Sequence, residues 1–442
     1  MARLGLILLA FFALCAPAAA VDRYVPMKGA PAPGPARYDR VFVQQLGPAG
    51  ADSVLVLVPG TAGGAGSITP AARALVRRVR GMQVWIVDRR EQAFEDTTVF
   101  EQRDPDAALD YYLGFKYRRV LGDDAKFVAE WGLRVQLADL RRVIRRAARG
   151  GRQVILGGHS AGASTAVAYA AWDFGGRAGW RDLHGLVLID GGLLGSFQSA
   201  DADRARRELR EIRQGDVFFD LLGFGIPEIA QIFAQVGALY AYERPDAPST
   251  LQGLPLLPEA FKPPFPVTNE ALVGYAFDAS TSPEALSLIH FRAGRLAESG
   301  DPRPWQDGEL TPLRRFARAF AASRPDATEW YYPRRLLLDI DAASPLRMTA
   351  AARLLGLRLR HGREIDVPLY AYSTELTSGR VARGARRLAR ISPIDEPTVV
   401  DDRRASHLDP VAAAPRRNRF VRTATPFLRR IARAAAPIAR SR

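Results

Sequence analysis

Short apolar runs alternate with segments of helical periodicity through the first half of the chain. The apolar runs lie at 41–43, 54–58, 84–87, 154–156 and 186–189, and helical spacing occupies 71–79 and 133–148. The runs are apolar at consecutive positions, which is typical of strands covered on both faces. Strands of this kind alternating with helices predict a mostly parallel sheet flanked by helices, an α/β fold.

The alternation stops after Gly192. Between 193 and 365 the pattern becomes mainly helical, with a one-sided apolar stripe from Ile229 to Tyr240 after Pro227 and a helix start expected at Ser282 and Pro283. Strand character returns at 367–372 and 398–400, and helical spacing at 381–391 and 418–431. We therefore expect a helical cap over 193–365, inserted between late strands of a sheet domain formed by 21–192 and 366–442.

The first twenty residues have a different pattern. Arg3 precedes an apolar run at 4–14, and alanines occupy 18–20. A basic start, a short apolar stretch and small residues at its end predict a signal peptide over 1–20, cleaved after Ala20, and hence an exported protein. Cys15 is the only cysteine, so the predicted mature chain excludes disulfides and cysteine-ligated metals.

The net charge of +15 adds little about function. The 62 basic residues are dispersed among periodic segments without interleaved aromatic motifs, so no specific nucleic-acid partner is expected. Arginines at 416–433 could associate weakly with an anionic envelope or membrane surface, although covering the last helix position of the sheet explains them more simply. The sequence holds no H-E-x-x-H and no phosphate-cradling G-x-x-x-x-G-K motif, so neither a metal nor a cofactor is expected.

One motif carries candidate chemistry. A predicted strand runs into G-H-S-A-G at 158–162, followed by small residues of a predicted helix. A serine on such a tight turn needs glycine on either side at two residues' distance, here Gly158 and Gly162, to avoid steric clash. The turn exposes the serine hydroxyl above the sheet, which predicts Ser160 as a nucleophile. The side chain of His159 is expected to point away from that of Ser160.

This motif resembles the corresponding turn of the α/β-hydrolase family, and two further segments of the chain also resemble that family. The first is V-P-G-T-A-G-G at 58–64, a glycine-rich turn after an early strand. In the family this turn supplies one oxyanion-hole N–H, here from Thr61 or Ala62, and Ala161 supplies the other. The second is S-H-L-D-P at 406–410, where the resemblance implies that His407 is the general base. His184, His290 and His361 do not occupy the family's position for the base. The alternative interpretation of the segment 58–64 is a plain strand-to-helix turn, and that of His407 is a surface histidine.

The acid of the implied triad has three candidates. Glu375, directly after the strand at 367–372, is the preferred one, because the family places its acid after the penultimate strand. Asp190 follows the preceding strand, where some members carry the acid, and Asp395 is the third candidate.

The resemblance implies a serine hydrolase that cleaves carboxylic esters through an acyl-enzyme. The size and apolar content of the cap favour a bulky or lipidic acyl group in a small-molecule or lipid ester. A peptidase or an acyltransferase with the same triad is an alternative, and so is a non-catalytic binding protein of the same fold.

Overall fold

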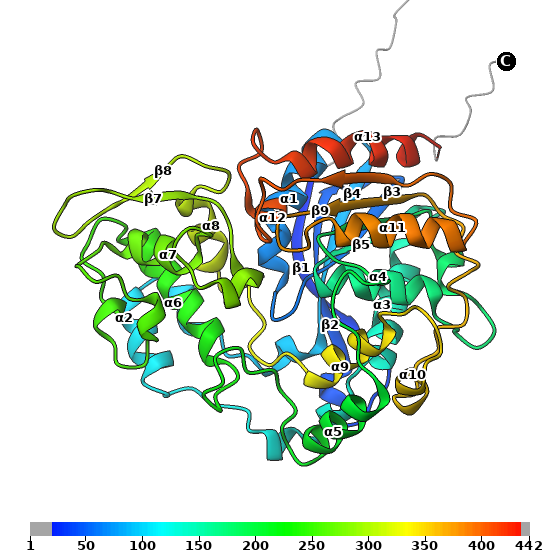
Figure 1. Cartoon of the computed structure of the whole chain (residues 1–442), viewed down its shortest axis with the longest axis horizontal. Helices are drawn as coiled ribbons and strands as arrows, with labels where there is room; N and C mark the ends of the chain where they lie inside the picture. Colours follow the sequence, from blue (N-terminus) through cyan, green and yellow to red (C-terminus); the bar gives the residue numbers. More distant parts are fainter. Residues whose placement is uncertain (1–19, 435–442) are drawn as a thin grey trace, which may run out of the picture.

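The computed structural model describes residues 20–434 and places one mixed sheet at the centre of the molecule (Figure 1). Within these residues the sheet has eight strands in the order β1–β2–β4–β3–β5–β6–β9–β10. Their bounds are β1 Ala20–Lys28, β2 Arg40–Pro48, β3 Ser53–Val58, β4 Met82–Asp88, β5 Gln153–His159, β6 Gly185–Ile189, β9 Leu369–Ser373 and β10 Thr398–Asp401. Only β2 runs against its neighbours, and the pairs from β4 to β10 are parallel. The predicted mostly parallel sheet is confirmed.

Both faces of the central strands are buried. Along β3, Val54 and Val56 pack into one apolar core, whereas Leu55 and Leu57 pack into a second core on the opposite face. This follows from the two-residue period of a strand, which sends successive side chains to opposite faces. It explains why the strands are apolar at consecutive positions.

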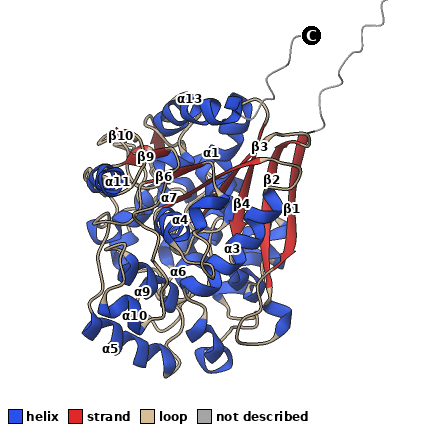
Figure 2. Cartoon of the chain, turned by 90° about the vertical axis from the view of Figure 1, so that its right-hand side faces the viewer, coloured by secondary structure: helices blue, strands red, loops and turns tan. Residues whose placement is uncertain are grey.

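Two sets of helices cover these faces. On one side lie α1 Ala65–Arg78, α12 Asp409–Ala412 and α13 Arg419–Ala434. On the other lie α3 Leu133–Ala147, α4 Ala161–Ala171, α9 Arg334–Ala343 and α11 Arg380–Ile391. Figure 2 shows α13 at the top of the molecule, above β3, with α3 and α4 lower down. The arginines of α13 face outward, while its Phe420 and Leu428 are buried against the sheet.

The segment between β6 and β9 divides into two parts. Helices α6 Ile229–Glu243, α7 Asn269–Phe277 and α8 Leu313–Phe320 form a lobe beside the sheet domain (green, Figure 1), with the small sheet of β7 Gly294–Leu296 and β8 Trp305–Asp307. By contrast, α5 Ala202–Arg213 and α10 Ala350–Leu354 pack with α9, which itself contacts α3 and α4. Part of the expected cap therefore extends the helical layer of the sheet domain.

The lobe also takes in an earlier segment of the chain. The short helix α2 Pro105–Ala108 packs on α6, and Asp106 accepts hydrogen bonds from Tyr240 and Arg244. The sequence pattern did not reveal this contribution, because the joining contacts are polar and lie between segments far apart in the chain.

Several local expectations differ from the structure. Strand β1 was not predicted; most of its residues lie just after the expected cleavage point. The helix expected after Ser282 and Pro283 is a kinked 3-10 segment, Glu284–Ile289. Apart from Ala20, the predicted signal peptide lies outside the described residues. Between residues 20 and 434, no helix combines the length and the apolarity needed to cross a bilayer.

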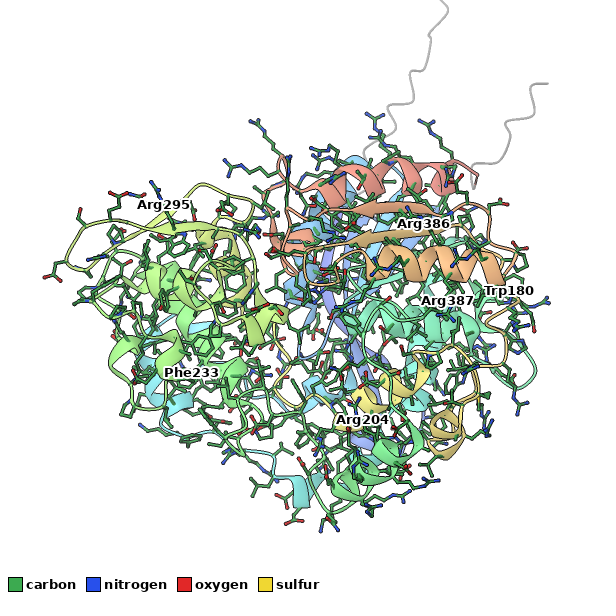
Figure 3. All side chains as sticks on the ribbon, in the orientation of Figure 1. Trp180, Arg204, Phe233, Arg295, Arg386 and Arg387 are labelled. Atoms are coloured by element: carbon green, nitrogen blue, oxygen red, sulfur yellow. The ribbon has the colours of Figure 1, made fainter. Side chains whose placement is uncertain are left out.

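Exposed arginines are spread over several elements. Figure 3 labels Arg295 on β7 at one end of the molecule and Arg386 and Arg387 on α11 at the other. Their separation agrees with the dispersed charge pattern of the sequence.

Candidate active site

Ser160 lies on the sharp turn between β5 and α4. Its φ of 54° and ψ of −124° are a strained conformation for a residue with a side chain. A Cβ on Gly158 would lie 2.3 Å from the backbone of Gly162, and a Cβ on Gly162 would lie 2.0 Å from the carbonyl oxygen of Val58. Both positions therefore require glycine. The N–H of Ser160 donates to Ile189 of β6, 2.9 Å away, and fixes the turn against the neighbouring strand.

His407 and Asp190 form a buried pair. Nδ1 of His407 donates to the carboxylate of Asp190 at 2.6 Å, and both side chains are almost fully shielded from solvent. Asp190 directly follows β6, whereas His407 lies in the loop after β10. This contact fixes the imidazole tautomer, leaving Nε2 as the nitrogen able to take up a proton.

Two threonines hold the Asp190 carboxylate. It accepts hydrogen bonds from the N–H and hydroxyl of Thr374 and from the hydroxyl of Thr377, the last at 2.6 Å. Burial alone would raise the pKa of Asp190, but the hydrogen bonds from His407 and the threonines outweigh it and hold the pKa below its ordinary value. Asp190 is therefore charged at neutral pH.

The structure does not bring Glu375, the preferred acid, to His407. Its carboxylate pairs with Arg292 at 2.5 Å, and more than half of its side chain is exposed. Glu375 lies two residues beyond the end of β9, after the chain has turned outward, whereas Asp190 lies directly after the adjacent β6. Asp395 is exposed, between α11 and β10. The residue that pairs with His407 is thus the second candidate.

His159 lies beside His407. Its Nε2 donates to the main-chain carbonyl of His407 at 2.9 Å, and the two ring centres are 4.4 Å apart. Burial and the neighbouring His407 lower the pKa of His159 to about 3, so the ring is neutral. No local sequence pattern indicates this contact, because it joins residues 248 positions apart.

The glycine-rich turn after β3 and the start of α4 supply N–H donors near Ser160. Thr61, Ala62 and Ser160 line the same pocket. In the described chain, the N–H groups of Thr61 and Ala62 have no backbone acceptor. Ala161 is the first residue of α4, so its N–H has no acceptor within the helix. The N–H of Ala161 and those of Thr61 and Ala62, the two alternatives for the second donor, are thus available to a ligand.

The loop carrying His407 is joined to the lobe. The buried carboxylate of Asp409 accepts from the N–H of Arg292 at 3.1 Å and from the hydroxyl of Thr311 at 2.6 Å, and the N–H of Leu408 donates to His290. Asp409 also accepts from the N–H of Ser406 at 2.8 Å. Burial raises the pKa of Asp409 to about 7.

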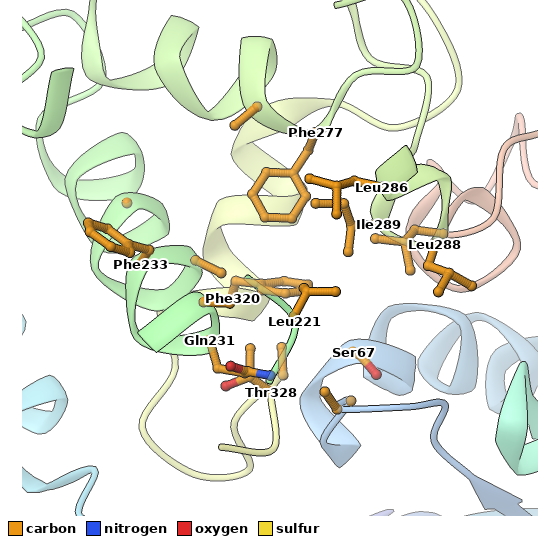
Figure 4. Close-up of a pocket in the computed structure, with 18 of the residues that line it drawn as sticks. Ser67, Leu221, Gln231, Phe233, Phe277, Leu286, Leu288, Ile289, Phe320 and Thr328 are labelled. Atoms are coloured by element: carbon orange, nitrogen blue, oxygen red, sulfur yellow. The ribbon is translucent and has the colours of Figure 1, made fainter. Parts of the chain in front are cut away.

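An apolar pocket extends from Ser160 into the lobe. Ser160, His159 and His407 line its inner end, and the lobe supplies mainly leucine and phenylalanine side chains. Figure 4 shows Phe233, Phe277, Leu286 and Phe320 around this space, with Gln231 and Thr328 as polar groups at its lower side. The structure records no hydrogen bond from the Ser160 hydroxyl to His407 within residues 20–434; such contacts often tighten only when substrate binds.

Taken together, the described residues join a strained serine, an imidazole fixed by a charged carboxylate and free N–H donors at one end of an apolar pocket. This combination is suited to nucleophilic attack on an acyl carbon.

Comparison with known proteins assigns the fold. No family model and no curated protein matches this sequence. Among solved structures, a proposed lipase from Sulfolobus solfataricus is similar with a TM-score of 0.53 at 15% identity, over 94% of this chain and 97% of the other. An esterase from Thermogutta terrifontis has a TM-score of 0.42 at 13% identity, over 92% of this chain and 99% of the other. Epoxide hydrolase A from Mycobacterium thermoresistibile has a TM-score of 0.43 at 16% identity, over 93% of this chain and 98% of the other. The chain has the α/β-hydrolase fold.

Proposed function

We propose that this chain is an exported serine hydrolase that cleaves carboxylic esters with bulky, apolar acyl groups. The observation that carries the proposal is that His407 and the strained Ser160 line the same apolar pocket, with the His407 imidazole hydrogen-bonded to the buried Asp190. A fold alone would not justify an activity, because one fold hosts many functions.

In the proposed reaction, Nε2 of His407 removes the proton of Ser160 as Oγ attacks the ester carbonyl carbon. The carbonyl π electrons move onto the oxygen, and backbone N–H groups of Ala161 and of the 60–63 turn stabilise the resulting oxyanion. Collapse of this intermediate breaks the bond to the alcohol, which takes the proton from His407. His407 then takes a proton from water as the water attacks the acyl carbon; the bond to Ser160 Oγ breaks, Oγ regains the proton from His407, and the acid is released. Asp190, in place of the expected Glu375, stabilises the charged imidazole throughout.

The lining of the pocket supports an apolar acyl group. A peptide substrate would bring several N–H and C=O groups that need partners, and apart from Gln231 and Thr328 the lobe offers mainly leucine and phenylalanine side chains. A hydrocarbon tail would instead gain from leaving water. The pocket therefore favours an ester with a long or bulky hydrocarbon tail over a peptide.

The proposal that the protein is exported rests on the N-terminal sequence pattern. The proposed signal peptide ends at Ala20, and mass measurement of the protein recovered from the extracytoplasmic fraction tests this, since a mature chain should begin at Val21.

Covalent labelling tests the enzymatic proposal. A long-chain alkyl phosphonate ester with a 4-nitrophenolate leaving group should modify the wild type once, releasing one 4-nitrophenol, and stop ester hydrolysis, whereas Ser160→Ala should take up no label. Folding of both proteins is checked by circular dichroism. A folded wild type that takes up no label and hydrolyses no ester would contradict the proposal. Adding an alcohol acceptor distinguishes transfer from hydrolysis, because a transferase would form the new ester in preference to the acid.

A further inference from the structure

We propose that Arg89 is a positioning residue for oxyanion stabilisation, holding the turn at 59–63 so that the N–H of Thr61 faces the reacting carbonyl. This inference rests on the proposed function, because it concerns how the same site would stabilise an oxyanion. It concerns Thr61, one of the two donors between which the sequence left the choice open.

The Arg89 side chain binds this turn through carbonyl groups. Arg89 follows β4, which pairs in parallel with β3, so the residue lies next to the turn that leaves β3. Its Nη2 donates to the carbonyl oxygens of Pro59 at 2.6 Å and Gly60 at 3.2 Å, and Nη1 lies 3.5 Å from that of Gly63. One buried guanidinium thus contacts carbonyl groups at both ends of the turn.

The direction of the Thr61 N–H follows from peptide geometry. In a trans peptide the C=O of one residue and the N–H of the next point in opposite directions. The C=O of Gly60 points towards Arg89, and it also accepts the N–H of Gly63 at 3.3 Å. The N–H of Thr61, on the same peptide plane, must therefore point away from Arg89. Thr61 lines the pocket with Ser160, and a Cβ on Gly60 would lie 3.0 Å from that of Ser160, so we place the Thr61 N–H on the side of the candidate site.

Other groups hold Arg89 and the far side of the turn. Nη1 of Arg89 pairs with Glu329 at 2.5 Å, both side chains are 1% exposed, and the guanidinium lies 5.0 Å from the ring centre of Tyr332. The N–H of Glu329 donates to the carbonyl of Ala62 at 2.9 Å. Ala62 has a φ of 52°, which residues other than glycine rarely adopt, so the turn keeps this shape only while the contacts around it persist.

An arginine is required by this geometry. The planar fork of a guanidinium reaches several acceptors at once, whereas a lysine ammonium is a compact point charge. Arg89→Lys therefore keeps the charge opposite Glu329 but loses simultaneous contact with the turn. Because a buried variant can fail to fold, Arg89→Met/Glu329→Leu is the second variant; it removes both charges together and leaves neither unpaired.

The test compares two inhibitors that differ only at the reacting carbon. A long-chain alkyl trifluoromethyl ketone adds to Ser160, forming an Oγ–C bond and an oxyanion while the serine proton passes to His407. The corresponding secondary alcohol occupies the pocket but forms no oxyanion. A control, Arg335→Met/Asp339→Leu, removes a buried ion pair that lies away from the pocket.

We expect both Arg89 variants to bind the ketone at least tenfold more weakly, to lose kcat by a similar factor and to bind the alcohol unchanged. Outright removal of an oxyanion donor costs roughly 10²–10³-fold in kcat. The control should bind both inhibitors as the wild type does. Unchanged ketone affinity in a folded Arg89 variant, or equal weakening of ketone and alcohol, would overturn the inference. Failure of the wild type itself to bind the ketone or take up phosphonate would instead refute the proposed function.

Discussion

Nε2 of His159 donates a hydrogen bond of 2.9 Å to the main-chain carbonyl of His407. The residue before the proposed nucleophile thus holds the backbone of the proposed base. Since a carbonyl can only accept, the proton of the neutral His159 ring must lie on Nε2. The ring acts here as a fixed donor, while the proton uptake required by the reaction falls to His407.

This contact predicts different effects of two substitutions on the rate. His159→Phe keeps a ring but removes the donor, so kcat should fall about tenfold, the equivalent of one hydrogen bond of about 1.4 kcal/mol. His159→Gln keeps an N–H donor and should retain more activity. Measuring kcat for ester hydrolysis and thermal unfolding of both variants tests this prediction. An equal loss of kcat in both would show that the N–H donor at position 159 does not determine the rate.

The pKa of His159 also predicts how stability varies with pH. The folded value is about 3, whereas an unfolded histidine titrates near its ordinary 6.5. The unfolded chain therefore binds the proton more readily, and the contribution of His159 to the free energy of unfolding is fully present above about pH 6.5 and lost as pH falls towards 3. Urea unfolding between about pH 7 and pH 4 should show a smaller loss in His159→Gln than in the wild type. Identical losses would contradict a buried, neutral His159.

The choice between the two acids can be tested directly. Asp190→Asn should lower kcat by up to roughly 10⁴-fold, as losing the carboxylate behind a catalytic histidine does in serine proteases. Glu375→Gln should change kcat less than twofold, because it removes only a half-exposed ion pair with Arg292, and exposed pairs contribute little. A large loss in the Glu375 variant alone would reverse the assignment.

The buried carboxyl of Asp326, which lies near the glycine-rich turn, predicts a second pH dependence of the free energy of unfolding, opposite in sign to that of His159. Burial raises the pKa of Asp326 to about 7, while its backbone oxygen holds the N–H of Gly66. The pKa of Asp326 is higher in the folded chain than in the unfolded chain. Its contribution to the free energy of unfolding is therefore fully present below about pH 4 and is lost as pH rises through about 7. Asp326→Asn should flatten the decline in unfolding free energy across this range. Asp203→Asn, at an exposed ion pair, is the control and should leave the slope unchanged.

The lobe side of the pocket predicts acyl-chain selectivity. Ala230, Ala234 and Gly237 line it at helical spacing on α6, and a phenylalanine at position 234 would occupy part of the space. Ala234→Phe should lower kcat/KM for long-chain 4-nitrophenyl esters by about tenfold or more, the loss of two or more buried methylene groups. Hydrolysis of the acetate ester should be unchanged. A uniform decrease over all chain lengths would show that the pocket does not bind the tail.

The sheet was predictable because burial on both faces leaves a strong local pattern. Val54 and Leu55 belong to different cores, and their adjacency in sequence already implies covered strands. Ser160 was recognisable for a similar reason, since its turn demands glycines at fixed spacing that Gly158 and Gly162 supply.

The acid was harder to predict because strand order in space decides it. Glu375 and Asp190 both follow strands, and the sequence does not say which carboxyl His407 meets. Thr374 and Thr377, on either side of Glu375, donate hydrogen bonds to Asp190, which follows the adjacent strand β6. Hydroxyl donors near a candidate acid are therefore the one local sign of where the acid lies. The contribution of α2 to the lobe likewise depends on contacts between distant segments, which no local pattern records.

The hydrogen bonds of Asp409 and Leu408 to the lobe constrain how this protein can be engineered. They fasten the segment that carries the proposed base to Arg292, Thr311 and His290 of the lobe. Exchanging the lobe alone would remove these partners and leave the buried Asp409 carboxylate with the N–H of Ser406 as its remaining donor among the described residues. An exchanged lobe therefore has to keep a main-chain N–H at position 292, a hydroxyl at position 311 and the main-chain carbonyl of position 290.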